Sequence, residues 1–191
     1  MNVVKIKQIE KELLSVYDFD LVITASGYET RASYFVDNCG FDISYIKNKY
    51  VLAFTTDPFS ITRKKNDEVF LKHGFNFVLC AGSSSKEIID IISDLILGTS
   101  KKEIFIIIDY SSMTRIWYGA VISFLKTLEN KSKTVHLFFS YTEAEFMIPP
   151  KEEPETINFS PIKGFCNLSI PAKPTALIIG LGYEKKRAFG L

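Results

Sequence analysis

Two short polar segments carry most of the side chains that could bind a ligand. The first spans residues 26–31 and places a glycine, a carboxylate and a guanidinium in one loop. Gly27 would let the backbone approach a ligand closely. Glu29 could bind a ribose hydroxyl or cap a helix, and Arg31 could pair with a phosphate or with the acid of the second segment. The candidate ligand-binding residues here are Ser26, Gly27, Tyr28, Glu29 and Arg31.

The second segment, residues 109–115, reads Asp-Tyr-Ser-Ser-Met-Thr-Arg. Its candidate residues are Asp109, Ser111, Ser112, Thr114 and Arg115. Hydroxyl groups and free amides at the start of a helix can cradle a phosphate, and an arginine can hold it with two hydrogen bonds. A purely structural alternative is a helix cap by Ser111 or Ser112, with Asp109 paired to Arg115.

An alternation of apolar strands and amphipathic helices must position these segments. We predict strands at residues 21–25, 49–55, 75–80, 103–108 and 135–140. We predict helices at residues 5–16, 30–38, 60–73, 86–97 and 114–129. Such alternation implies parallel strands joined by right-handed crossovers. The expected fold class is α/β, a Rossmann-like three-layer sandwich with a mainly parallel sheet of five to six strands.

The predicted strand order, 3-2-1-4-5, determines where a ligand would bind. Open parallel sheets bind ligands beyond the carboxyl ends of the strands, where the order reverses. The first and fourth strands are neighbours at that point, so the two polar segments should lie side by side. Residues 141–143, after the fifth strand, could complete one wall. The first loop lacks the GxGxxG spacing of dinucleotide-binding proteins.

The loop at residues 109–115 resembles the second signature of CARF-type domains, which are Rossmann-like sensors of cyclic oligonucleotides in prokaryotic immunity. In that family a polar loop after the first strand and an Asp-x-Ser/Thr-rich loop after the fourth form the ligand pocket. The resemblance assigns these roles to the two segments above. Ser112 and Met113 stand where the family has a glycine pair. The loop also resembles those of uncharacterised bacterial defence-associated proteins and, more distantly, the PRPP loop of phosphoribosyltransferases.

The amino-acid composition changes after the fifth predicted strand. We divide the chain into a Rossmann-like domain (1–145), a Pro/Glu-rich extended segment (146–174) and a last segment (175–191) holding a sixth strand at 175–180. In that last segment, residues 182–184 repeat the Gly-Tyr-Glu of residues 27–29. Either the echo is chance, or a second repeat begins there and the chain stops as that unit starts.

Composition excludes several function classes. The 191 residues are 47% hydrophobic, with a net charge of +1, which argues against a broad nucleic-acid or membrane surface. Only His73 and His136 are available, neither near a predicted strand end, so a Ser/His/Asp triad is not expected. The spacing of the three cysteines predicts neither a disulfide framework nor a metal site. No cofactor, signal peptide or membrane span is expected, and we predict a cytoplasmic protein.

Three functions remain open at this level. The first is a binding or sensor domain for a nucleotide, a cyclic oligonucleotide or another phosphorylated small molecule, within a bacterial defence system. The second is an enzyme acting on a nucleotide or phosphosugar, with Asp109 or Glu29 as general acid or base. The third is a structural partner domain in a larger complex. We expect a homodimer or a partner protein.

Overall fold

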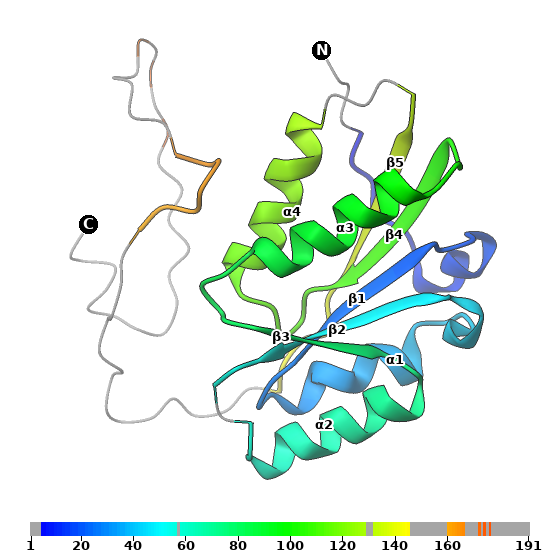
Figure 1. Ribbon diagram of the computed structural model, residues 1–191, viewed down its shortest axis with the longest axis vertical. Helices are drawn as coiled ribbons and strands as arrows, with labels where there is room; N and C mark the ends of the chain where they lie inside the picture. Colours follow the sequence, from blue (N-terminus) through cyan, green and yellow to red (C-terminus); the bar gives the residue numbers. More distant parts are fainter. Residues whose placement is uncertain are drawn as a thin grey trace.

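The computed structural model describes residues 5–56, 58–128, 132–145 and 160–166, and the single residues 172, 174 and 176. Five parallel strands form one sheet in the order β3-β2-β1-β4-β5 (Figure 1). The strands are β1 (Leu21–Ser26), β2 (Asn48–Phe54), β3 (Asn76–Cys80), β4 (Glu103–Asp109) and β5 (Thr134–Ser140). The predicted fold class, strand order and parallel pairing are therefore confirmed.

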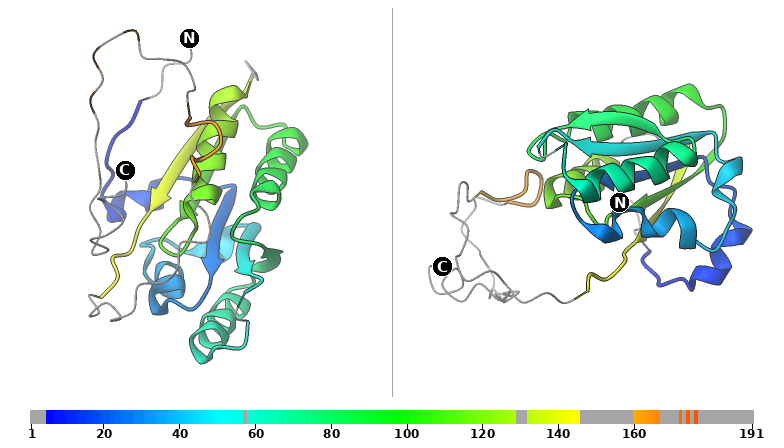
Figure 2. Two further views of the ribbon diagram at one scale, coloured as in Figure 1. Left: turned by 90° about the vertical axis from the view of Figure 1, so that its left-hand side faces the viewer. Right: turned by 90° about the horizontal axis from the view of Figure 1, so that it is seen from below.

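Helices cover both faces of this sheet, which makes a three-layer sandwich (Figures 1 and 2). The α-helices are α1 (Tyr34–Asn38), α2 (Ile61–Lys72), α3 (Lys86–Gly98) and α4 (Arg115–Thr127). Helices α1 and α2 pack on one face, and α3 and α4 pack on the other. The change of face follows from right-handed crossovers, because the chain moves outward from β1 to β3 and then returns past β1 to β4.

The centre of the sheet is apolar on both faces. In β4, Ile106 and Ile108 pack toward α3 and α4, whereas Ile107 packs toward α1 and α2. All three side chains are buried. A strand covered on both faces needs a continuous apolar run, and that run made β4 recognisable in the sequence.

The predicted opening helix at residues 5–16 is wrong for the first half of its length. Residues 5–10 are not helical, and only a 3-10 helix at Lys11–Val16 forms. The apolar residues that suggested a helix face solvent: Ile6 is 92% exposed and Val16 is 74% exposed. Leu14 and Tyr17 pack against the core instead. A short helix needs a packed apolar face, and of residues 11–16 only Leu14 packs against the core.

The helix predicted at residues 30–38 is present but divided. A 3-10 helix spans Thr30–Ser33, and α1 continues from it. This tight first turn keeps the β1 loop close to the end of its strand. The remaining predicted helices are present, with ends that differ from the predictions by one or two residues.

Residues 160–166 pack against α4. The amide of Phe165 donates to the carbonyl of Ile162 over 3.0 Å, and Ile162 lies beside Gly119 of α4. A Cβ added at Gly119 would come within 2.9 Å of the Ile162 Cγ2 atom. Apart from the single residue 176, the predicted sixth strand falls on residues outside the described part of the chain, as does the repeated Gly-Tyr-Glu turn. None of the described helices is long and apolar enough to cross a membrane.

Candidate ligand site at the ends of β1 and β4

The loops that follow β1 and β4 meet in the structure. The Ser112 hydroxyl donates to Oε2 of Glu29 over 2.7 Å. This contact arises because β1 and β4 pair directly and both end at the same edge of the sheet. The structure thus brings together side chains from the two polar segments that the sequence singled out.

Arg31 ties this pair to the segment that follows β5. Its Nη2 lies 3.2 Å from Oε1 of Glu29. Its Nη1 donates to the Tyr141 hydroxyl over 2.9 Å and to the Thr142 carbonyl over 2.7 Å. The guanidinium also lies over the Tyr141 ring, whose other neighbour is the stacked ring of Tyr110. Residues 141 and 142 therefore form one wall of the candidate site.

Asp109 and Ser111 lie behind this group and hold the loops in place. Asp109 is 1% exposed, and its Oδ1 accepts from the Ser111 hydroxyl over 2.5 Å. The Ser111 oxygen in turn accepts from the amide of Thr142 over 2.7 Å. Burial raises the pKa of Asp109 to about 6, against the opposing effects of the Ser111 hydrogen bonds and the charge of Arg31. A proton can therefore bind or leave Asp109 near neutral pH.

A side chain of α2 fixes the β1 loop from behind. Asn66 is 3% exposed, and its amide donates to the carbonyls of Gly27 (3.0 Å) and Glu29 (2.9 Å). Its own oxygen accepts from Ser33 over 3.1 Å. The sequence prediction missed Asn66. The available signal was a polar residue on the inward stripe of α2, one turn before the buried Phe70.

A second buried polar group lies next to Asn66. Arg63 of α2 donates to Asp67 over 2.8 Å and to the carbonyl of Phe54, at the end of β2. Asp67 also accepts from the Ser26 hydroxyl over 2.6 Å. Ser26 is fully buried and faces α2, so it does not face the site with Ser112 and Arg31. Its placement supports the loop from within the domain.

Helix α4 is not capped by Ser111 or Ser112, as one interpretation of the sequence had it. Thr114, rather than Ser111 or Ser112, is the N-cap, and its hydroxyl oxygen accepts from the Trp117 amide. The Thr114 hydroxyl also donates to the Gly82 carbonyl over 3.0 Å, which joins this turn to the loop after β3.

Arg115 does not pair with Asp109. Within the described residues it makes no ion pair, and it lies exposed on the first turn of α4. Instead, the positive charge that acts on the pKa of Asp109 comes from Arg31, which lowers it against the larger effect of burial.

The outer surface of the site carries two side chains that are free to meet a ligand. Tyr28 is 71% exposed, and Arg115 is exposed. Arg115 is the first residue of α4, whose N-cap Thr114 accepts from the Trp117 amide. Glu29 and Ser112 are partly exposed. The accessible chemistry thus combines a cation, a carboxylate, a hydroxyl and an aromatic ring.

No protein family, no curated protein and no solved structure matches the chain. In the part of the chain that the structure describes, no cluster of His, Cys, Asp and Glu side chains could hold a metal ion. The class of protein is therefore defined by the fold and the site geometry: a Rossmann-like α/β domain with converging polar loops at its topological switch point.

Proposed function

We propose that this domain binds a nucleotide or another phosphorylated small molecule at the loops after β1 and β4, and acts as a sensor or regulatory domain. The observation that carries the proposal is the Ser112–Glu29–Arg31 network, which joins both loops where the strand order reverses. Ligands of open α/β sheets bind at this position.

The accessible groups fit the parts of a nucleotide. Arg115 suits a phosphate, because it is exposed at the start of α4 and makes no ion pair among the described residues, and the N-terminus of a helix favours anions. Glu29 can accept hydrogen bonds from ribose hydroxyls, with Ser112 beside it. The exposed ring of Tyr28 can stack on a base. A role in a bacterial defence system rests only on the resemblance of the loop at residues 109–115.

A thermal-shift panel tests the proposal. The ligands are mono-, di- and triphosphate nucleosides, cyclic di- to tetranucleotides and ribose 5-phosphate. A ligand at 100 times its Kd stabilises a protein by about 2.7 kcal/mol, so a bound nucleotide should raise Tm by roughly 5–10 °C. Arg115→Ala should reduce that shift without changing the Tm of the free protein, because Arg115 makes no ion pair among the described residues. Lys64→Ala, an exposed change on α2, is the matched control.

The outcome discriminates among the three functions. If no ligand shifts the wild-type Tm, the binding proposal fails, and a role as a structural partner or homodimer gains support. Light scattering then gives the oligomeric state. A shift that disappears in Arg115→Ala but persists in Lys64→Ala supports the proposed site.

A second candidate function is favoured by one observation, the pKa of about 6 at Asp109. A carboxyl that titrates near neutral pH can serve as a general acid or base. The enzyme proposal requires Asp109 to become accessible, because it is 1% exposed. Chromatography of each nucleotide after incubation with the protein tests it: turnover that is lost in Asp109→Asn supports an enzyme, and the absence of turnover with every bound nucleotide rejects it.

A further inference from the structure

Asp109, at the end of β4, is a buried carboxyl group with few hydrogen-bond donors. It is 1% exposed, and among the residues that the structure describes it forms no ion pair. Ser111 donates to its Oδ1 atom from the hydroxyl over 2.5 Å and from the amide over 3.4 Å. A carboxylate that loses its water needs several donors or a cation to remain ionised. Burial therefore favours the protonated form of Asp109.

The neighbouring strand β1 places a second buried polar group beside Asp109, but not as a donor. The register pairs Ile23 with Ile108, so Thr24 and Asp109 follow as neighbours. Side chains alternate along both strands, and these two point to the face that α1 and α2 cover, as Ile107 does. Thr24 is fully buried, and its hydroxyl has no hydrogen-bond partner within the described residues. The surroundings of Asp109 are thus polar, but they supply little that would stabilise a negative charge.

Arg31 is the cation that acts on Asp109, and its charge is shared. It lowers the pKa of Asp109 against the larger effect of burial, which raises that pKa to about 6. The same guanidinium lies 3.2 Å from Glu29 and donates to the Tyr141 hydroxyl over 2.9 Å. Because Glu29 already balances the charge of Arg31, this cation cannot neutralise further negative charge near Asp109.

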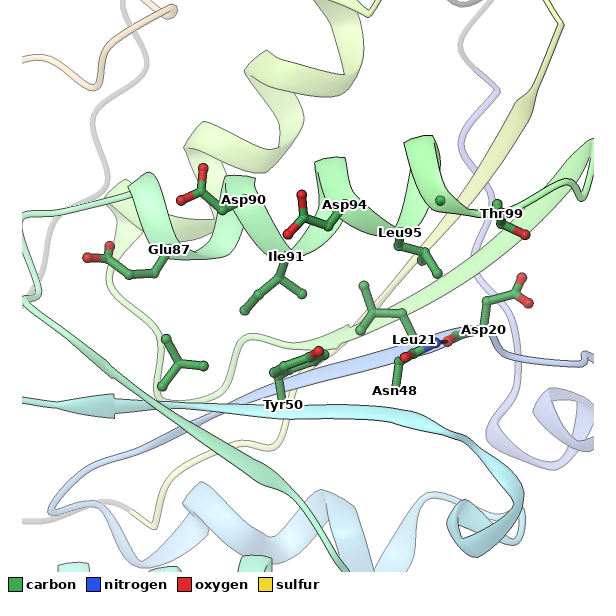
Figure 3. A pocket seen from close by; sticks show the side chains of 12 residues that line it. Asp20, Leu21, Asn48, Tyr50, Glu87, Asp90, Ile91, Asp94, Leu95 and Thr99 are labelled. Carbon is green, nitrogen blue, oxygen red and sulfur yellow. Dashed lines mark hydrogen bonds between the residues drawn. The ribbon is translucent and has the colours of Figure 1, made fainter.

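Other ionisable groups of the described domain are paired, exposed or on the opposite face of the sheet. On α2, Arg63 lies 2.8 Å from Asp67, and at the start of α4 Arg115 is exposed. On the opposite face, acidic residues of α3 line a groove of about 680 Å³ between that helix and strands β1 to β3 (Figure 3). They are Glu87, Asp90 and Asp94. The sheet separates these carboxylates from Asp109, so a ligand at the loops is the nearest source of new negative charge.

We infer that a phosphorylated ligand binds together with one proton, which Asp109 takes up, so that the domain responds to the ligand and to pH at the same time. The inference rests on the proposed function, because it concerns the same loops. A bound phosphate adds negative charge in front of Asp109, and a ligand that covers the loops removes water from them. Both changes favour the neutral carboxyl group. By thermodynamic linkage, the protonated protein then binds the ligand more tightly than the ionised protein does.

The path from the ligand position to Asp109 is short. Ser111 contacts Asp109, and the next residue, Ser112, donates to the partly exposed Glu29. A unit charge about 8 Å away, acting through an effective dielectric constant of about 20, changes a proton affinity by more than about tenfold. The Kd of an anionic ligand should therefore rise at least about tenfold as Asp109 loses its proton. Binding should be tightest below about pH 6.

Isothermal titration calorimetry at about pH 5 and about pH 8 tests this coupling. The probes are the cyclic nucleotides of the thermal-shift panel, because a phosphodiester keeps its charge across this range, whereas a phosphate monoester titrates at about pH 6. In the wild type we expect a Kd at least about tenfold higher at the upper pH. Proton uptake is counted with the wild type alone, in two buffers of different ionisation enthalpy at about pH 7, and should be about half a proton per bound ligand.

Two variants identify the group that takes up the proton. Asp109→Asn should bind with a low Kd at both pH values, because the amide is neutral like the protonated acid. Asp42→Asn, a change at an exposed residue, is the matched control and should keep the wild-type pH dependence. If a phosphate monoester alone binds, the Asp109→Asn protein gives the reference, since the ligand's own titration is common to both proteins.

The outcomes separate this inference from the proposed function. A ligand that binds the wild type with no pH dependence beyond its own titration leaves the proposed function standing and overturns the coupling. A pH dependence that Asp109→Asn retains also overturns it, because another group, such as His73 or His136, would then bind the proton. If no ligand of the panel binds at either pH, the coupling and the proposed function both fail.

Discussion

The Ser112 hydroxyl donates a 2.7 Å hydrogen bond to the Glu29 carboxylate, joining residues 83 positions apart in the sequence. Each residue follows a different strand, β4 and β1 respectively, and each is partly exposed. The bond closes the gap between the two loops at the point where a ligand of this fold is expected. It is therefore both a structural contact and the centre of the candidate site.

A double-mutant cycle should detect this contact. Ser112→Ala and Glu29→Gln should couple by about 1 kcal/mol in the free energy of unfolding, because the hydrogen bond is charge-assisted but partly solvated. Urea denaturation of the four proteins measures the coupling. Ser112→Ala with Glu68→Gln is the control, since Glu68 is an exposed residue of α2, and those two changes should be additive. Additivity of the Ser112 and Glu29 changes would contradict the contact.

Asn66 should contribute more to stability than an exposed asparagine. In Asn66→Ala the carbonyls of Gly27 and Glu29 lose their donor, so we expect a loss of about 2–3 kcal/mol in the free energy of unfolding. Asn76→Ala is the control, because that side chain is exposed and makes one 3.3 Å hydrogen bond. Its loss should stay below about 1 kcal/mol. Equal losses in the two variants would show that Asn66 does not hold the loop.

Asp109 should make stability fall as pH rises. Its folded-state pKa of about 6 lies above the value near 4 for an unfolded chain, so the native state binds the proton more tightly. Its contribution is fully present below about pH 4 and is lost by about pH 6–7. Relative to Asp109→Asn, the wild type should lose about 2–3 kcal/mol over this range.

Urea denaturation between pH 3.5 and 7.5 measures this difference, with Asp42→Asn as the control. Asp42 is exposed, and the Ser44 hydrogen bonds lower its pKa, so it titrates with the opposite sign. Asp42→Asn should therefore keep the Asp109-dependent fall. If the wild type and Asp109→Asn change in parallel across the range, the burial of Asp109 does not shift its titration.

Gly119→Ala should release residues 160–166 from α4. The new Cβ would lie 2.9 Å from Ile162, so the segment must move, while alanine favours the helix itself by about 1 kcal/mol. We expect faster trypsin cleavage after Lys163 without a lower Tm of the domain. Mass spectrometry gives the initial rate of that cleavage. Gly98→Ala in α3 is the control, because a Cβ there meets nothing within 4 Å. An unchanged rate in Gly119→Ala would contradict the contact.

The sequence predicted the strands and their order because those features depend on local pattern and on the handedness of crossovers. The continuous apolar run of β4 and the glycines that end helices are visible in one dimension. The opening helix was predicted wrongly for the converse reason. Ile6, Ile9, Leu13 and Val16 are spaced like one face of a helix, but only tertiary packing decides whether such a face is buried.

The sequence predicted that two loops form the candidate site, but it did not predict the hydrogen bonds and ion pairs between their side chains. No local pattern shows that Arg31, rather than Arg115, is the cation near Asp109. That choice depends on how residues 141 and 142 leave β5 and meet Arg31. Asn66 was missed because a polar residue in the middle of a helix is ordinarily a solvated one, and only the approach of the β1 loop makes it a buried donor.

The two bonds to Thr142 have a mechanical consequence. Its amide is held by Ser111 and its carbonyl by Arg31, immediately after β5 ends. Tension applied through the chain beyond Glu145 would therefore act first on these two side chains, before it reached the ladder between β4 and β5. The place where a ligand is expected and the place where the chain is anchored after β5 are therefore the same.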